Sequence, residues 1–256
     1  MAPPFVSGEA ADIPLHGELR YGWELARLVV DGDFRRPGRR ARAAPVLLIP
    51  GFLAGDPSLA VLAGWLRRRG SLPTAAGIRL NVGCAERAVR SIEERVRRLA
   101  EHTGRRVVVI GQSRGGTLAR VVAVRHPDAV GTLVMLGSPV LDQLSVGPTV
   151  LSAVRSVARL GDLGVPGFFS SQCRDGQCCA CFRDDLRAPL PDAICAVAIY
   201  SRTDGVVSWK ACLDSCAEQV EVDSSHSGMS VNREVYRVLA EILDQHEDRE
   251  AERWTG

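Results

Sequence analysis

Short apolar runs alternate with amphipathic helical patterns along most of the chain, and this alternation is the feature that most restricts its fold. The apolar runs are continuous stretches of Val, Ile and Leu, as expected of parallel strands that are buried on both faces. The segments between them have apolar residues at helical spacing, with Arg and Glu on the opposite face. The sequence therefore predicts an α/β protein with a mostly parallel central sheet and helices on both faces.

The strands and helices of this α/β pattern are predicted from their residue types and spacing. We expect strands over residues 44–49, 78–82, 106–110, 132–136, 194–200 and 220–222. We expect helices over residues 59–69, 86–102, 117–125 and 233–245. Gly70 and Gly104 stand where the first two of these helices should end, because glycine readily adopts the left-handed conformation that closes a helix.

The long interval between residues 138 and 192 interrupts the alternation. It contains a helical pattern over residues 151–160 and then a stretch rich in Gly, Pro, Ser and Cys. A loop of this length in a compact domain is usually functional, and lids over binding clefts are common. We therefore predict a Cys-rich cap insertion at about 140–192. The expected domain organisation is a helical and linker extension at 1–43, the α/β domain with this cap at 44–247, and a polar tail at 248–256.

Composition and charge exclude several kinds of partner. The chain has 256 residues, of which 46% are hydrophobic, so it can bury the core of one large domain. Its formal net charge is +2, which gives no reason to expect nucleic acid or an anionic membrane surface as a partner. The basic run over residues 35–42 is interpreted as a solvated linker. No signal peptide and no stretch of membrane-spanning length is present in the sequence, so we expect a cytoplasmic protein without an integral membrane span and leave its oligomeric state open.

The segment Gly111-Gln112-Ser113-Arg114-Gly115 directly follows an apolar strand and precedes an amphipathic helix. This is the setting of a nucleophile elbow, in which a sharp turn from strand to helix exposes a strained serine. Side chains two residues before and after the serine would clash, so both positions require glycine. The start of the helix also directs free N–H groups at any developing anion. We therefore predict that Ser113 is a nucleophile.

A serine hydroxyl needs a general base, and the chain has five histidines. His226 falls just after the last predicted strand, in the loop where the base of such a site belongs. The four other histidines are expected at the surface: His16, His102, His126 and His246. The sequence therefore predicts His226 as the base.

The base in turn needs an acid that orients it, and Asp204 is the leading candidate. It follows the predicted strand at 194–200 and precedes His226 by one further strand, which gives the chain order serine, acid, histidine. Asp142 is an alternative, because it follows the preceding strand. Asp214 and Asp223 are expected to be surface and turn residues.

An oxyanion hole requires two backbone N–H groups beside the nucleophile. One of them belongs to the residue after the serine, which is Arg114. The second should come from the loop after the first strand of the sheet, where Gly51 permits close approach of the backbone. We expect Phe52 to supply it, although the same segment could be a simple Pro-Gly turn.

Seven of the eight cysteines lie in the last third of the chain, and Cys84 lies before it. The pairs Cys178-x-x-Cys181 and Cys212-x-x-x-Cys216 could supply four thiolates to a structural zinc ion. Alternatively, the cysteines from 173 to 181 could form disulfides with those at 212 and 216, or all could remain buried thiols. We expect disulfides or thiols, and no metal.

Together, five segments make the sequence resemble the bacterial lipase and esterase branch of the α/β-hydrolase superfamily. They are Pro50-Gly-Phe52, Gly111-Gln-Ser-Arg-Gly-Gly116, Leu136-Gly-Ser-Pro139, Ser201-Arg-Thr-Asp-Gly-Val-Val207 and Ser225-His226. The resemblance implies a catalytic triad of Ser113, Asp204 and His226, an acyl-enzyme intermediate on a carboxylic ester, and no cofactor. The chain departs from the pattern at Pro50, where lipases often have histidine, and in its Cys-rich cap.

Three functional classes remain open from the sequence. The first is hydrolysis of an ester or thioester, and the second is acyl transfer to an alcohol or amine by the same triad. The third is a non-enzymatic binding protein with a hydrolase fold. The expected substrate is a small ester with an apolar acyl group, because the apolar residues at 150–160 and 165–169 could line a pocket, although they could equally pack the cap onto the sheet.

Overall fold

The computed structural model describes residue 13 and residues 15–35 and 44–255. Most of the basic run that the sequence analysis assigned to a linker therefore lies outside the described residues, as does most of the expected N-terminal extension before residue 15. The segment from residue 15 to residue 35 is described, and it packs onto the α/β domain rather than standing apart from it.

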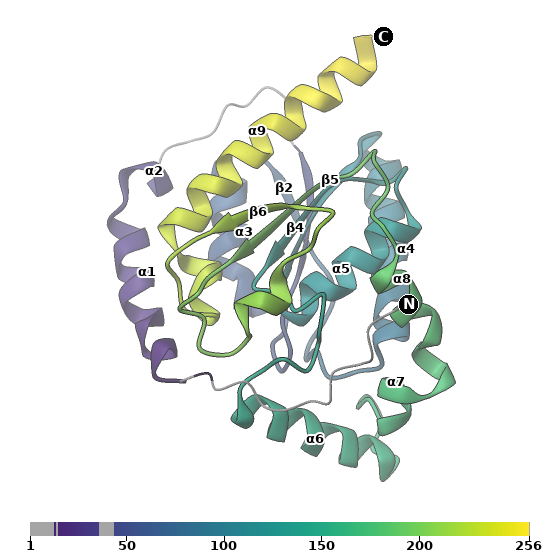
Figure 1. The fold of residues 1–256 in the computed structure, drawn as a ribbon. Coiled ribbons are helices and arrows are strands. Elements are labelled where there is room, and N and C mark those ends of the chain that lie inside the picture. The colour runs from purple at the N-terminus through teal and green to yellow at the C-terminus, as the bar shows by residue number, and fades with distance from the viewer. Residues whose placement is uncertain (1–12, 14, 36–43, 256) are drawn as a thin grey trace.

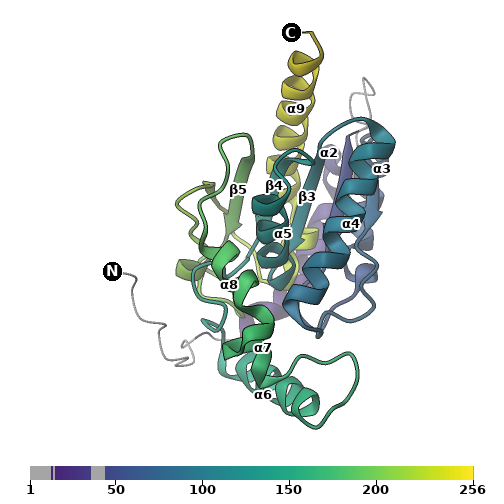
Figure 2. The same cartoon turned by 90° about the vertical axis from the view of Figure 1, so that its right-hand side faces the viewer.

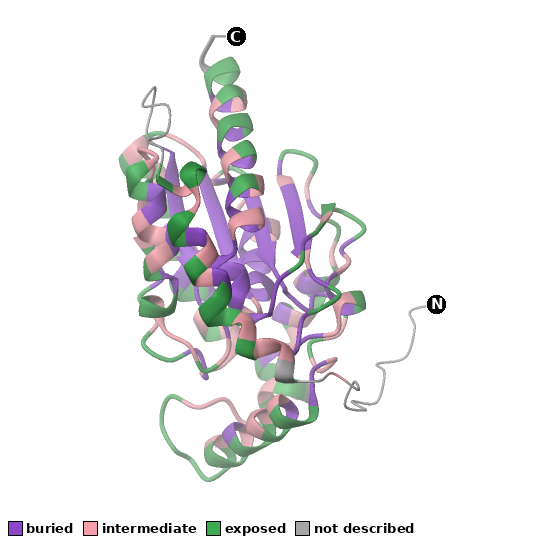
Figure 3. Cartoon of the chain, turned by 90° about the vertical axis from the view of Figure 1, so that its left-hand side faces the viewer, coloured by how far each residue is buried: buried purple, intermediate pink, exposed green. Residues whose placement is uncertain are grey.

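The centre of the molecule is a six-stranded sheet in which every pairing is parallel, with the strand order β2-β1-β3-β4-β5-β6 (Figure 1). Its strands are β1 (Pro45–Ile49), β2 (Leu72–Ala75), β3 (Val107–Gln112), β4 (Val130–Leu136), β5 (Cys195–Tyr200) and β6 (Glu218–Glu221). Strands β1, β3 and β4 are buried along their whole length, as their high content of Val, Ile and Leu predicts. Figure 3 shows the central strands in purple, which marks buried residues.

Helices cover both faces of this sheet, which confirms the predicted fold class (Figures 1 and 2). One face carries α1 (Tyr21–Val30), α3 (Ala60–Arg68) and α9 (Arg233–Thr255). The other face carries α4 (Ala85–Thr103), α5 (Arg114–Arg125) and α8 (Ala180–Arg187). Alternate residues of each strand point to opposite faces, so Val46 and Val108 pack with the first group of helices, whereas Leu47 and Val109 pack with the second.

Shorter elements complete the chain. They are η1 (Leu15–Arg20), α2 (Gly32–Arg35), η2 (Asp56–Leu59), α6 (Pro148–Asp162), α7 (Ser171–Asp175), η3 (Gln177–Cys179), η4 (Trp209–Cys212) and η5 (Ser227–Val231). Within the described residues, no helix is both long enough and apolar enough to cross a lipid bilayer.

The second predicted strand is wrong. Residues 78–82 form no strand and bend at residues 79–81, and the strand at this edge of the sheet is β2, which pairs with β1. The alternation of Ile78, Leu80 and Val82 resembled a strand, but the segment instead bonds to the loop after β1, where Asp56 N–H donates to Ile78 O at 2.9 Å. Strand β2 gave little signal because it contains Pro73, a residue that is tolerated in strands at a sheet edge.

The predicted cap interval divides into two parts in the structure. Helices α6 and α7 lie beyond one end of the sheet, whereas α8 packs against α5 as part of the helical layer (Figure 2). Phe182 and Leu186 of α8 belong to the main core. Only the first part of the interval therefore has the position of a cap.

The expected polar tail is also different, because α9 continues to Thr255. His246, expected at the surface, is 1% exposed, and its Nδ1 lies 2.9 Å from the Thr132 hydroxyl. Burial lowers the pKa of His246 to about 4, so the ring is neutral. The last turns of α9 thus hold buried polar groups against the amino-terminal end of the sheet.

Candidate active site

The loops that follow β1, β3, β5 and β6 meet at one end of the sheet, because all six strands run in the same direction. The strand register places Ile49 opposite Gly111 and Gln112 opposite Leu136, so these strands end at the same level. The carboxyl end of a parallel sheet is the usual location of ligand sites. Phe52, Ser113, Asp204 and His226 lie in these loops, and Arg114 is the first residue of the helix that follows Ser113.

Ser113 has the backbone geometry of a sharp turn between strand and helix. Its φ is 53° and its ψ is −125°, and it is one of two described non-glycine residues with a positive φ. A Cβ at Gly111 would overlap the backbone of Gly115, and one at Gly115 would overlap the carbonyl oxygen of Ile49. The turn therefore forms only with glycine at both places, which is the physical reason for the motif.

Asp204 and His226 form a direct pair across the loops after β5 and β6. His226 Nδ1 lies 2.7 Å from Asp204 Oδ2, and both residues are buried. Asp204 Oδ1 accepts hydrogen bonds from the N–H groups of Val206 and Val207, each at 2.8 Å. The carboxylate is therefore fixed, and with a proton on Nδ1 the opposite nitrogen of the ring is free to act as a base.

Opposing effects set the pKa of His226. Burial lowers it, but the charge of Asp204, the hydrogen bond to Asp204 and the charge of Glu18 outweigh burial, so the pKa is raised above the usual 6.5. The negative charges of Asp204 and Glu18 stabilise the protonated form of the His226 ring, which is the form that a base takes when it accepts a proton.

Gly137 lies beneath this acid-base pair at the end of β4. Its φ is 54°, and a Cβ there would approach both Asp204 Oδ2 and His226 Nδ1 at 3.2 Å. The next residue, Ser138, lies so close to Gly116 that a Cβ on that glycine would overlap its side chain. The Leu-Gly-Ser-Pro segment of the sequence thus lies between the Asp204–His226 pair and the turn that contains Ser113.

Two acidic residues of the N-terminal segment hold the histidine loop, and neither was predicted from the sequence. Glu18 of η1 accepts hydrogen bonds from the N–H groups of His226 at 2.7 Å, Ser227 at 2.9 Å and Gly205 at 3.2 Å. It thereby links the loop of the base to the loop of the acid. No local pattern in the sequence indicates such a role, because the acceptor and its donors are separated by about two hundred residues.

Glu24 of α1 is the second of these residues, and it is 4% exposed. It accepts hydrogen bonds from Ser225 N–H at 2.8 Å and from the Ser225 hydroxyl at 2.6 Å. A Cβ at Gly228 would overlap its carboxylate. A charged residue on a short amphipathic helix is usually solvated, so its burial could not be read from the sequence.

The loop after β1 approaches Ser113 at Gly51. A Cβ at Gly51 would lie 3.3 Å from Ser113 Cβ, which is a tight contact, so glycine favours the close approach of this loop to Ser113. The loop turns at Leu53, whose φ is 58°, and Asn81 holds its start by donating to Pro50 O at 2.8 Å. Phe52 follows Gly51 in this loop, and Arg114 directly follows Ser113 as the first residue of α5.

The side chain of Arg114 reaches away from the nucleophile into the region under the cap. It donates to Asn81 O and Oδ1 at 2.9 Å and to Gly83 O at 2.6 Å, and it lies 5.4 Å from the centre of the Phe169 ring. The surrounding protein lowers its pKa to about 10, whereas the nearby sulfur groups of Cys84, Cys179 and Cys173 act in the opposite direction. Among the described residues, no carboxylate pairs with this guanidinium group.

Other candidates do not join the site. Asp142, the alternative acid, accepts a hydrogen bond from Leu144 N–H at 3.0 Å in its own loop. Asp214, expected at the surface, is 3% exposed and pairs with Arg120 at 2.6 Å. Among the described residues, no hydrogen bond joins the Ser113 hydroxyl to His226.

The cysteines are grouped differently from either set that the sequence analysis considered. All eight are free, Cys181 and Cys216 are exposed, and Cys212 is buried beside Val207 in a separate apolar cluster. Instead, Cys84 joins three cysteines of the cap interval, which are Cys173, Cys178 and Cys179. Neither set included Cys84, which is 95 residues before Cys179 in the sequence although their Sγ atoms lie 3.4 Å apart.

Comparison with known proteins supports the architecture. A model of the family described as alpha/beta hydrolase fold matches residues 44–176. A lipase of Bacillus licheniformis in its mature form is similar in structure, with a TM-score of 0.59, 15% identity, and coverage of 81% of this chain and 94% of the lipase. No curated protein has a significant sequence match to the chain.

Two further solved structures show the same likeness at similar identity. A soluble variant of monoglyceride lipase from Saccharomyces cerevisiae has a TM-score of 0.55 and 12% identity, and the match covers 84% of this chain and 90% of the lipase. A monoacylglycerol lipase of Paleococcus ferrophilus has a TM-score of 0.52 and 13% identity, with coverage of 80% and 96%. At these identities the likeness is one of fold.

Proposed function

The chain belongs to the alpha/beta hydrolase fold family, and on this premise we propose that it is a serine hydrolase that cleaves carboxylic esters through Ser113, His226 and Asp204. The observation that carries the proposal is the 2.7 Å contact between His226 Nδ1 and Asp204 Oδ2 at the sheet end where Ser113 adopts its positive φ. Fold alone does not determine activity, so the proposal depends on the geometry of Ser113, His226 and Asp204.

In the proposed reaction, His226 removes the proton of the Ser113 hydroxyl as the oxygen attacks the carbonyl carbon of the ester. The tetrahedral intermediate collapses, and the protonated His226 gives its proton to the departing alcohol. Water, deprotonated by His226, then attacks the acyl-enzyme and releases the acid. Asp204 keeps the ring in the orientation and tautomer that both steps need.

We propose that the N–H groups of Phe52 and Arg114 stabilise the oxyanion of each tetrahedral intermediate. The close approach of Gly51 to Ser113 supports this assignment for Phe52. The position of Arg114 as the first residue of α5 supports it for the second donor, because the first N–H groups of a helix have no partner within the helix. Each such donor typically contributes about 10² to 10³ in rate.

The proposed substrate is an ester with an apolar acyl group. Phe52 and Phe169 lie side by side, with ring centroids 6.2 Å apart, between the oxyanion loop and the segment before α7. Aromatic surface beside the nucleophile suits a hydrocarbon chain. The similar proteins, which are a lipase, a monoglyceride lipase and a monoacylglycerol lipase, agree with this class of substrate.

The test combines fluorophosphonate labelling with hydrolysis of p-nitrophenyl esters of graded chain length. We expect the wild-type protein to be labelled and to turn over, and Ser113→Ala to lose both signals, with kcat reduced by about 10⁶-fold. Ser156→Ala, at an exposed serine of α6, is the matched control and should retain both.

A wild-type protein that is folded yet neither labelled nor active would overturn the proposal in favour of a binding protein. Adding an alcohol or amine acceptor to the same assay separates hydrolysis from acyl transfer. Formation of the ester from an alcohol, or of the amide from an amine, in place of free acid would replace the hydrolase by an acyltransferase with the same nucleophile.

A further inference from the structure

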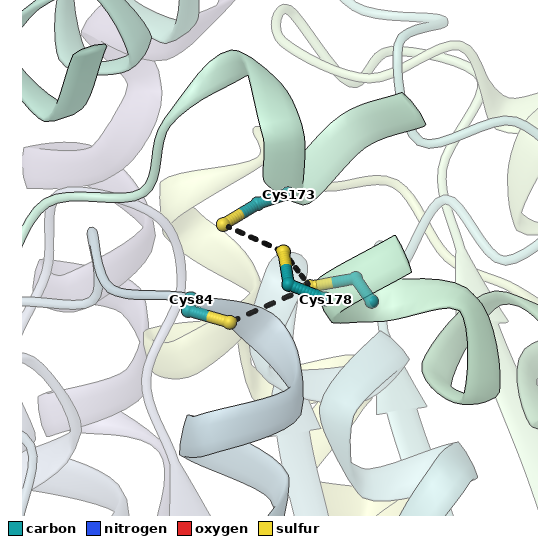
Figure 4. A group of neighbouring side chains, drawn as sticks. Cys84, Cys173 and Cys178 are labelled. Carbon is teal, nitrogen blue, oxygen red and sulfur yellow. Dashed lines mark hydrogen bonds between the residues drawn. The ribbon is translucent and has the colours of Figure 1, made fainter. Parts of the chain in front are cut away.

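Four cysteine side chains from distant parts of the chain converge next to the cap (Figure 4). Cys84 precedes α4, Cys173 belongs to α7, and Cys178 and Cys179 lie in η3. All four Sγ atoms lie within 4.8 Å of one another. Cys84, Cys173 and Cys178 extend from different parts of the chain, and their sulfurs lie close together in Figure 4. This group is separate from the proposed triad, and the proposed function makes no use of it.

The spacing of the sulfurs fits a tetrahedral metal site. The Sγ–Sγ distances are 3.4 Å for Cys84 and Cys179, 3.6 Å for Cys173 and Cys178, and 3.8 Å for Cys178 and Cys179. Zinc binds thiolate at about 2.3 Å, which places the sulfurs of a regular tetrahedron about 3.8 Å apart. A disulfide requires about 2.05 Å, and two separate disulfides would not require the pairs to share one centre.

The surroundings of Cys84 favour a thiolate at this member of the group. Cys84 is the N-cap of α4, where the free N–H groups and the positive end of the helix dipole stabilise an anion. Arg114 lies on the same side, bonded to the carbonyl of Gly83, and among the described residues it has no carboxylate partner. A zinc ion with four thiolates keeps a net negative charge, which would compensate this partly buried cation.

We propose that Cys84, Cys173, Cys178 and Cys179 bind one structural zinc ion. This differs from the absence of metal expected from the sequence, where Cys84 was not considered as a ligand. The site uses four protein ligands and leaves no position for water, so it acts in structure rather than in catalysis. Binding releases the thiol protons to solvent, and the exposed side of Cys178 offers a path of entry.

The zinc ion would fasten the cap to the domain beside the nucleophile. It joins α7 and η3 to the start of α4, and the same region is held by Phe169 N–H, which donates to Val82 O at 2.8 Å. Through Gly83 and Arg114 the site adjoins the helix that begins after Ser113. Loss of the metal should therefore loosen the cap first and leave the sheet intact.

The test measures metal in the full-length protein, purified in reductant without a metal-binding tag. Elemental analysis should find about one zinc per chain, as four-cysteine sites bind a single ion. Growth with cobalt should give the visible bands of a tetrahedral thiolate site. Cys173→Ser and Cys178→Ser should each reduce bound zinc at least fivefold, whereas Cys181→Ser, at an exposed cysteine outside the group, should not.

Three results would overturn the proposal. They are wild-type protein with substoichiometric zinc, disulfides between these cysteines found by mass spectrometry of freshly reduced and refolded protein, or another metal such as iron in place of zinc. Because metal content is measured in the wild-type protein, an unstable variant does not prevent a decision. Fluorophosphonate labelling of the same samples reports Ser113 separately, so failure of the zinc site is distinguishable from failure of the proposed hydrolase.

Discussion

The two halves of the candidate site are held in place by different means. The nucleophile half, from Gly111 to Gly116, is positioned by steric contacts within one turn and with the adjacent strand β1. The histidine half is positioned by polar contacts from the other end of the chain, where Glu18 and Glu24 accept five hydrogen bonds from the loops after β5 and β6. One half is therefore encoded locally, and the other depends on the N-terminal segment.

This difference has a thermodynamic consequence. The turn at Ser113 is formed by the strand and helix that make up the core, so it should persist as long as the domain is folded. The histidine loop depends on two carboxylates of a small peripheral segment, and such segments open more readily than core strands. The acid-base pair should therefore be lost before the nucleophile under mild destabilisation.

Asp204→Asn should have the largest effect on the histidine half without changing the nucleophile half. Asparagine keeps the shape but cannot hold the proton on Nδ1 in the same way, so kcat should fall by about 10⁴-fold. Asp142→Asn, in a loop that does not contact His226, should retain activity within about twofold of wild type. Ester hydrolysis measures both variants, and equal losses would remove Asp204 from its proposed role.

Gly115→Ala should damage the nucleophile half through sterics alone. The added methyl group overlaps the Ile49 carbonyl oxygen, and because backbone must move, we expect a loss of about 3 kcal/mol or more in the free energy of unfolding. Gly64→Ala, in the middle of α3 where a Cβ meets only the end of Arg68, should instead stabilise by up to about 1 kcal/mol. Urea denaturation measures both, and a neutral Gly115→Ala would contradict the steric account.

Glu24→Ala should break the long-range support of the histidine loop. It leaves the N–H and hydroxyl of Ser225 buried without their acceptor, which costs about 2 to 3 kcal/mol of stability. Glu24→Gln preserves the shape and one acceptor, so its loss should be about half as large. Hydrogen exchange should show faster opening at residues 223–228 in Glu24→Ala, with β3 still protected. Uniform loss of protection would mean that the two halves are not separable.

Glu18→Gln should give the smallest effect, and it is best seen in pH dependence. The charge of Glu18 contributes to the raised pKa of His226, and the base must be neutral to act, so kcat/KM falls as pH drops through that pKa. Removing the charge lowers this pKa, so the acid limb of the kcat/KM profile should move to lower pH. An unchanged limb would show that Glu18 acts only as a hydrogen-bond acceptor.

The parts of the site that follow strand ends could be predicted because they depend on local pattern. Residues such as Ser113 and His226 were found from their positions after apolar strands, and the parallel sheet then brings those loops to one edge. His246 and Asp214 were assigned to the surface because polar residues usually lie there, yet both are buried with polar partners. Burial of a polar group depends on partners that are distant in sequence.

The sequence by itself determined the α/β class, the strained turn at Ser113 and the order of the loops that carry Asp204 and His226. These features follow from hydrophobic periodicity, the placement of glycines and the order of the strands, which are all properties of residues that are near one another in the sequence. Only the tertiary structure brought Glu18 to the histidine loop and Cys84 to the cysteines of the cap. Contacts of this kind join segments separated by about ninety to two hundred residues. Their formation depends on how the helices pack on the sheet, and no local pattern encodes it.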